Sequence, residues 1–125
     1  MIKLKEYLLN NDNKQSTLSF FKGKTEYYLT LDDILFFETE EGTVYAHTKD
    51  DTYQVGERLY RLIDLLPSNF IRVSKSTILN INPILSINKN LASSSLVMFK
   101  NSHKQIFVSR HYFHSLQEKL KERKN

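Results

Sequence analysis

Two short stretches of the sequence combine cations with hydroxyl side chains, the groups that contact phosphates and base edges in protein–DNA complexes. In the first, residues 70–80, apolar side chains can anchor the segment to a core while Arg72, Lys75 and Ser76 project outward. The second stretch consists of Ser109, Arg110 and His111. It falls where a strand-like run meets a helix-like run, so free helix N–H groups and a guanidinium would favour a phosphate or a base edge. Each cluster alone fits a solvated strand end, but the two together favour DNA.

Paired carboxylates are the first candidates for catalysis. They occur as Asp32-Asp33, Glu40-Glu41 and Asp50-Asp51, each at an expected turn or at the start of an element. Adjacent residues of a strand point to opposite faces, so none of these pairs is a facing carboxylate dyad. Turn chemistry and solvation explain them better than acid–base catalysis does.

Histidine offers a second route to chemistry. His111 and His114 stand three residues apart in a helix-like run and could share a metal ion, whereas His47 and His103 are distant in sequence. No companion carboxylate has the spacing of a known zinc motif, and the chain has no nucleophile elbow, phosphate-binding glycine loop or dinucleotide fingerprint. We therefore expect no enzyme and no cofactor, with a metal-dependent hydrolase as the weakest alternative.

Composition bounds the remaining classes. The chain has 125 residues, 40% hydrophobic and 26% charged, which suits one globular domain. Cysteine is absent, which removes disulfides and thiolate zinc sites. No apolar run approaches the ~20 residues of a membrane helix, and the N-terminus lacks the features of a secretory signal. We expect a cytoplasmic protein without a membrane segment.

The distribution of charge is more informative than its total. The net charge is +4, but residues 1–62 contain 8 basic and 11 acidic side chains, a net charge of −3. Residues 63–125 contain 10 basic and 3 acidic side chains, a net charge of +7. Such asymmetry points to a polyanionic partner of the C-terminal half.

The elements that must position these groups are short strands and two helices. Turn residues separate strand-like runs at Thr17–Phe21, Thr25–Leu29, Ile34–Glu38, Thr43–Thr48, Thr52–Val55, Ser95–Lys100 and Lys104–Ser109. Apolar side chains at helical spacing predict one helix that starts at Leu59 and stops before Pro67, and a second helix after Ser109 as N-cap. Residues 8–16 and 88–95 are expected to be loops. The predicted fold is mainly β, with small antiparallel sheets and two short α-helices.

At these residues the sequence resembles the LytTR-type DNA-binding domain, the output module of many bacterial response regulators. Residues 70–80 follow the signature Phe-x-Arg-hydrophobic-His-Arg/Lys-Ser, two or three hydrophobic residues, then Val-Asn. Residues 33–38 match the family's opening strand, and residues 108–112 match its closing strand-to-helix junction. The resemblance covers about Tyr28 to Leu120, so we expect the domain to span residues 28–125. Residues 1–27 would add N-terminal strands and a loop to the same domain.

The resemblance implies that loops, rather than a recognition helix, enter the major grooves of double-stranded DNA at promoter direct repeats. Lys75 and Arg110 would contact bases. Phosphate contacts or loop supports would come from Arg72, Ser76, Ser109 and His111. A further contact, from Thr43, is the weakest expectation because Glu40 and Glu41 beside it would repel phosphate. Family members bind commonly as two molecules, so a homodimer on DNA is a further expectation.

Two features depart from the family pattern. Ser74 stands where many members have histidine. In addition, no receiver domain fits into residues 1–27. Met1 and the expected N-terminal strands therefore favour a stand-alone regulator. The alternative function is a β-rich protein-interaction domain that modulates another regulator. Its motivation is the acidic first half together with aromatic residues expected at the surface, Tyr27, Tyr28 and Tyr53.

Overall fold

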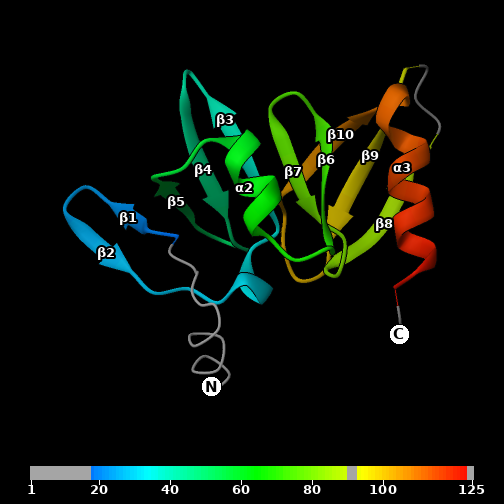
Figure 1. The fold of residues 1–125 in the computed structure, drawn as a ribbon. Coiled ribbons are helices and arrows are strands. Elements are labelled where there is room, and N and C mark those ends of the chain that lie inside the picture. The colour runs from blue at the N-terminus through cyan, green and yellow to red at the C-terminus, as the bar shows by residue number, and fades with distance from the viewer. Residues whose placement is uncertain (1–17, 90–92, 124–125) are drawn as a thin grey trace.

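The computed structural model describes residues 18–89 and 93–123. These residues form ten strands, two α-helices and one 3₁₀ helix, which confirms the predicted mainly-β fold class (Figure 1). In chain order the elements are β1 (Phe20–Lys22), β2 (Thr25–Tyr27), η2 (Leu31–Asp33), β3 (Phe36–Glu40), β4 (Thr43–His47), β5 (Thr52–Val55), α2 (Leu59–Leu65), β6 (Phe70–Ser74), β7 (Thr77–Asn80), β8 (Ile84–Asn88), β9 (Ser94–Phe99), β10 (Gln105–Ser109) and α3 (Arg110–Lys121).

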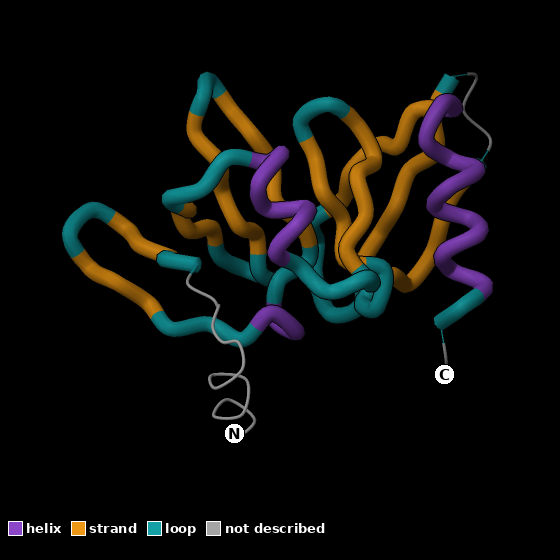
Figure 2. The backbone as a smooth tube through the Cα atoms, in the orientation of Figure 1, coloured by secondary structure: helices purple, strands orange, loops and turns teal. Residues whose placement is uncertain are grey.

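The strands form two antiparallel sheets. Seven strands pair in the order β2-β1-β5-β4-β3-β7-β6, and three pair in the order β10-β9-β8. The N-terminal hairpin joins the larger sheet because β1 pairs with β5, where Phe20 lies opposite Val55. In Figure 2 the helix α3 stands beside the smaller sheet, while α2 lies against the larger one.

Three of the hairpins close where the sequence predicts them. The β3–β4 turn consists of Glu41 and Gly42, both in left-handed backbone with φ of 51° and 84°. Two such residues in succession match the right-handed twist of the flanking strands, which is why this turn type favours hairpins. Gly23 of the β1–β2 turn and Asn101 of the β9–β10 turn are also left-handed, with φ of 57° and 58°.

Both helices follow the predicted apolar spacing. Helix α2 buries Leu59 and Leu62 and ends just before Pro67. Helix α3 buries Leu116 and has Ser109 at its N-cap position, as predicted, but the Ser109 side chain makes no capping hydrogen bond. The capping role proposed for that hydroxyl is therefore wrong, although the helix boundary is right.

Two hydrophobic cores lie on opposite faces of β3, β7 and β6, the strands at one end of the larger sheet. One core lies under α2 and contains Phe37, Phe70 and Ile78. The other lies between the larger sheet, the smaller sheet and α3, and contains Val73 and Leu79. Strands β6 and β7 contribute to both cores because successive side chains of a strand point to opposite faces. This arrangement fixes the smaller sheet and α3 relative to the larger sheet.

Several expectations need correction. Strand β8 was not predicted, and neither was the β6–β7 hairpin that residues 70–80 form. The rings of Tyr27 and Tyr53 pack edge to face with centroids 4.9 Å apart and are only partly exposed, whereas Tyr28 is 89% exposed. Some predictions fall outside the described residues. These are the start of the first expected strand, at Thr17, and two parts of the expected loops, residues 8–16 and 90–92.

Candidate nucleic-acid interface

Three connections that carry predicted DNA-contacting residues lie along one edge of the molecule. The β3–β4 turn, the β6–β7 turn and the β10–α3 junction all lie at the upper edge in Figures 1 and 2. The β9–β10 turn lies toward the opposite edge. The first two turns are neighbours, because the Thr39 N–H, near the β3–β4 turn, donates to the Ser76 carbonyl of the β6–β7 turn at 2.8 Å. The fold thus gathers the candidate residues at one edge.

The β6–β7 turn presents Lys75 and Ser76 to solvent. Ser74 pairs with Thr77, so these two residues alone form the turn, and both are exposed. The Lys75 ammonium makes no hydrogen bond or ion pair with the described part of the chain. A cation that is exposed and unpaired at a turn tip can reach a phosphate or a guanine edge without breaking an internal contact.

Arg72 lies beneath this turn and contacts its backbone. The Arg72 Nε donates to the Ser74 carbonyl at 3.2 Å, and its Nη2 donates to the Lys75 carbonyl at 2.6 Å. Ser74, at the place of the family's histidine, accepts the Ser76 N–H on its Oγ at 3.1 Å. Both side chains therefore stabilise the turn from within, a role the sequence left open for Arg72 and did not indicate for Ser74.

Asn80 anchors the other end of the same hairpin. Its side chain is fully buried, with Nδ2 donating to the Ile34 carbonyl at 2.9 Å. Its Oδ1 accepts from Asn69 Nδ2 at 2.7 Å and from the Asn82 N–H at 3.1 Å. A polar residue that closes an apolar run was the available sequence signal for this structural site, because buried polar groups must be hydrogen-bonded.

The β10–α3 junction carries the second cluster. Arg110 and His111 are exposed and Ser109 is half-buried. The Arg110 N–H donates to the Ser93 carbonyl at 3.1 Å, so this helix N–H is not free for a phosphate as the sequence suggested. The His111 ring lies edge-on to Tyr112, with centroids 4.9 Å apart. A contact to DNA from this junction therefore does not use the Arg110 N–H.

The β3–β4 turn brings negative charge to the same edge. Glu40 and Glu41 are exposed, and Thr43 is half-buried opposite Glu40. Burial and the nearby Glu40 raise the pKa of Glu38. These carboxylates would repel phosphate at short range. The turn is thus electrostatically unlike the other two connections.

The chain is similar to a known protein family. The model described as LytTr DNA-binding domain matches residues 24–121. The chain belongs to the LytTr DNA-binding domain family. The resemblance inferred from the sequence is confirmed.

Curated relatives agree with this LytTr assignment. An uncharacterized HTH-type transcriptional regulator of Staphylococcus aureus strain bovine RF122 / ET3-1 is 30% identical over 112 residues, which cover 90% of this chain and 76% of the relative. A regulator with the same description from strain NCTC 8325 / PS 47 gives the same values. Although those names refer to a helix–turn–helix, the α-helices of the described LytTr fold are separated by strands β6 to β10.

A solved structure matches the fold. The LytTr DNA-binding domain of a response regulator from Bacillus cereus superposes with a TM-score of 0.76 and 22% sequence identity, covering 86% of this chain and 98% of that one. At this identity the likeness concerns the fold. It supports the two-sheet arrangement that brings the three connections to one edge.

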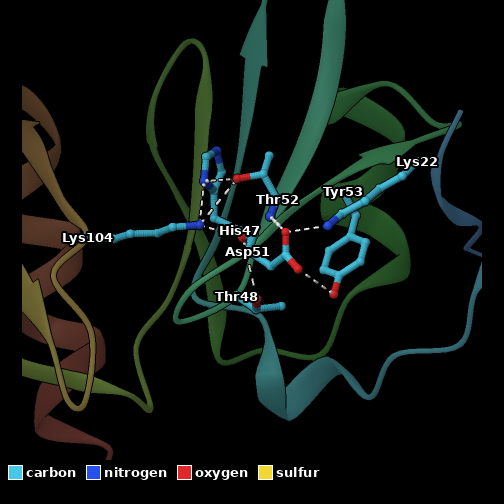
Figure 3. Close-up of polar contacts among 7 residues, drawn as sticks. All are labelled: Lys22, His47, Thr48, Asp51, Thr52, Tyr53 and Lys104. Atoms are coloured by element: carbon cyan, nitrogen blue, oxygen red, sulfur yellow. Dashed lines mark hydrogen bonds and ion pairs between the residues drawn. The ribbon is translucent and has the colours of Figure 1, made fainter.

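Not every cation of the LytTr domain's basic half faces solvent. Lys104, from the β9–β10 turn, donates to the Asp51 carbonyl, to Thr52 Oγ1 at 3.3 Å and to His47 Nδ1 at 3.2 Å (Figure 3). Arg123 donates from Nη1 to the carbonyls of Ile81, Asn82 and Ile84 at 2.8–3.2 Å. These two cations join parts of the fold, so the net charge of +7 overstates what is available to DNA.

The Lys104 network also determines the state of His47. An ammonium only donates, so His47 Nδ1 must accept and the ring is neutral, with Nε2 3.5 Å from Glu38 Oε1. Burial, and secondarily the charge of Lys104, lowers the pKa of His47 to about 4. Burial likewise lowers the pKa of Lys104. Within the described residues no cluster of His, Cys, Asp or Glu is arranged to hold a metal ion.

One further observation concerns the membrane. Among the described residues, neither α-helix is long and apolar enough to cross a bilayer. Helix α3 is amphipathic. Its apolar face packs on the core beside the smaller sheet, and its other face is charged.

Proposed function

We propose that the chain is a transcriptional regulator that binds promoter DNA sequence-specifically by inserting loop side chains into major grooves. Membership of the LytTr DNA-binding domain family supports the DNA-binding class. The single observation that carries the finer proposal is the position of exposed Lys75 and exposed Arg110 on separate connections along one edge. Two cations held at separate points of a rigid frame suit two separated contacts on a duplex.

We assign base contacts to Lys75 and Arg110. Their donors match the N7 and O6 acceptors of guanine, which is the commonest specific pairing of these side chains. Ser76, Ser109 and His111 flank them and would contact phosphates. Thr43 contributes least, because a duplex that reached it would approach Glu40 and Glu41.

We further infer that two molecules meet at promoter direct repeats, as a homodimer on DNA. A single edge with two reading side chains covers a short half-site, and a second copy doubles the sequence that is read. Residues 1–27 would belong to the same domain as residues 28–125. The pairing of β1 with β5 supports this boundary for the described part.

Selection of bound sequences from a random DNA pool tests this function. The wild-type protein should enrich one half-site in direct repetition. Lys75→Ala and Arg110→Ala should each weaken binding to the selected site by about 5- to 150-fold, equivalent to 1–3 kcal/mol, and relax preference at one base pair. Lys100→Ala is the matched control, because Lys100 is an exposed lysine beside the turn at the opposite edge. Equal affinity of all four proteins would overturn the assignment.

The alternative, a protein-interaction domain, has one supporting observation. Leu85 and Phe107 of the smaller sheet are 63% and 58% exposed. Salt separates the two functions, since DNA affinity falls steeply between 50 and about 200 mM salt whereas an apolar protein interface hardly responds. A partner complex that survives this range and excludes DNA would favour the alternative.

A further inference from the structure

We infer that Arg72 is a positioning residue that holds the β6–β7 turn in its DNA-reading shape, rather than a phosphate contact. This inference rests on the proposed function of Lys75. Its basis is the pair of hydrogen bonds from one guanidinium to two consecutive carbonyls, Nε to Ser74 at 3.2 Å and Nη2 to Lys75 at 2.6 Å.

The turn needs this support because its backbone is not of the favoured type. Two-residue hairpins prefer turns with positive φ, which match the twist of the strands. The described residues with positive φ are Gly23, Glu41, Gly42 and Asn101, so neither Lys75 nor Ser76 has one. The register also shifts between Arg72 and Ser74, which leaves a bulge just before the turn. A bulge disrupts the regular ladder of backbone hydrogen bonds, and here side-chain hydrogen bonds from Arg72 and Ser74 restrain the turn that follows it.

Three residues restrain the turn through four hydrogen bonds. Arg72 binds two carbonyls, Ser74 Oγ accepts the Ser76 N–H, and the Thr39 N–H binds the Ser76 carbonyl. Because the guanidinium is planar with several donors at fixed angles, it can engage two neighbouring carbonyls at once, whereas a lysine ammonium is a single point. The arrangement leaves the Lys75 side chain as the part of the turn that is not restrained.

Arg72 also satisfies polar groups of the turn. The Ser74 and Lys75 carbonyls each accept a hydrogen bond from Arg72 in the DNA-free protein. A turn fixed before binding avoids the entropy of ordering its backbone on DNA, worth about 5- to 30-fold in affinity per residue.

Arg72→Lys and Arg72→Met separate the two roles, because both keep an unbranched stem and only lysine keeps the charge. For a positioning residue, we expect both variants to bind the selected site about 5- to 30-fold more weakly than wild type. The slope of log affinity against log salt should stay within about 0.3 of the wild-type value, since no phosphate contact is lost. This slope does not depend on the active fraction of the sample.

For a phosphate contact, Arg72→Lys would bind nearly as well as wild type. Arg72→Met would then lower the magnitude of the salt slope by about 0.9. That result would overturn the inference.

Amide exchange in the DNA-free protein gives an independent test. Exchange of the Ser76 N–H should become faster in Arg72→Lys and Arg72→Met, as well as in Ser74→Ala, which removes its acceptor. Exchange at Ile78, in the buried part of β7, should be unchanged and reports that the hairpin is folded. Unchanged Ser76 exchange in both Arg72 variants would overturn the inference even if the protein bound no DNA, whereas failure of wild type to select DNA would overturn the proposed function alone.

Discussion

The neutral His47 makes the stability of the fold dependent on pH. Its pKa of about 4 in the folded state lies below the ordinary 6.5, so the unfolded chain binds a proton over a range in which the folded chain does not. Stability is therefore complete above about pH 6.5 and is lost progressively as the pH falls toward 4. Protonation would put a cation beside the Lys104 ammonium, 3.2 Å from Nδ1.

The magnitude follows from the two pKa values. The pKa difference of about 2.5 corresponds to a loss of at most about 3 kcal/mol in the free energy of unfolding. The His47 side chain is 18% exposed, and solvent screening there reduces the expected loss between pH 7 and 4.5 to about 1–2 kcal/mol. Glu38 faces His47 and acts in the opposite direction, because its raised pKa adds stability as the pH falls. Its effect is common to wild type and a His47 variant, and cancels in their difference.

Urea unfolding at steps from pH 7 to 4.5, followed by circular dichroism, measures this loss. His47→Asn keeps an acceptor toward Lys104 and does not titrate. It should be less stable than wild type at pH 7, because the stacking of His47 on Phe36 is lost, but it should show a flatter pH dependence. His114→Asn is the control, since His114 is 81% exposed and should leave the wild-type profile unchanged. Parallel profiles for wild type and His47→Asn would refute the reasoning.

Three other expectations concern single contacts. Asn80→Ala leaves the Ile34 carbonyl and the Asn69 and Asn82 donors without their partner, and should lower the unfolding free energy by about 2–4 kcal/mol in urea titration; a loss below about 0.5 kcal/mol would contradict the buried network. Gly42→Ala places a side chain at φ 84° and should cost about 1 kcal/mol, whereas Gly56→Ala, with no positive φ and its nearest contact at 3.9 Å, should be close to neutral; equal melting shifts would contradict this difference. Glu41→Gln should raise DNA affinity about 2- to 5-fold at low salt and less at high salt, with Glu26→Gln of strand β2 as control, and an increase that persists at high salt would argue against phosphate repulsion.

The sequence predicted those elements in which the backbone preference of the residue type matches the observed conformation. Gly42 and Asn101 tolerate left-handed backbone, and hairpins close at both. The β6–β7 turn was not predicted because it contains no Gly, Pro, Asn or Asp. Its support from Arg72 is recognisable only once the strands are paired. Strand β8 was not predicted because Pro83 and the Asn-rich residues that follow are typical of loops, whereas pairing with β9 decides its conformation.

For the candidate site too, residue type predicted some features and only the fold shows the others. Residue type alone identified Lys75 and Arg110 as exposed cations, but it could not separate them from Lys104 and Arg123, whose partners are backbone carbonyls distant in sequence. The total charge of the C-terminal half counts all four equally. Only the fold shows that Lys104 and Arg123 join distant parts of the protein, whereas Lys75 and Arg110 lie exposed at connections of the candidate interface.

The shared core has a consequence for how DNA would be read. Val73, just before the Lys75 turn, lies in the same buried cluster as Val108, just before the Arg110 junction, and Leu116 of α3. The two proposed reading side chains are therefore fixed to one packed core, and protein interiors are too dense to let such elements slide past each other. The separation of the two base contacts within a half-site should accordingly be constant. In the selected DNA pool, inserting one base pair between the two contacted positions should abolish the contribution of one contact, so that Lys75→Ala or Arg110→Ala no longer weakens binding further. Retained sensitivity to both substitutions on the lengthened site would show that the two connections move independently.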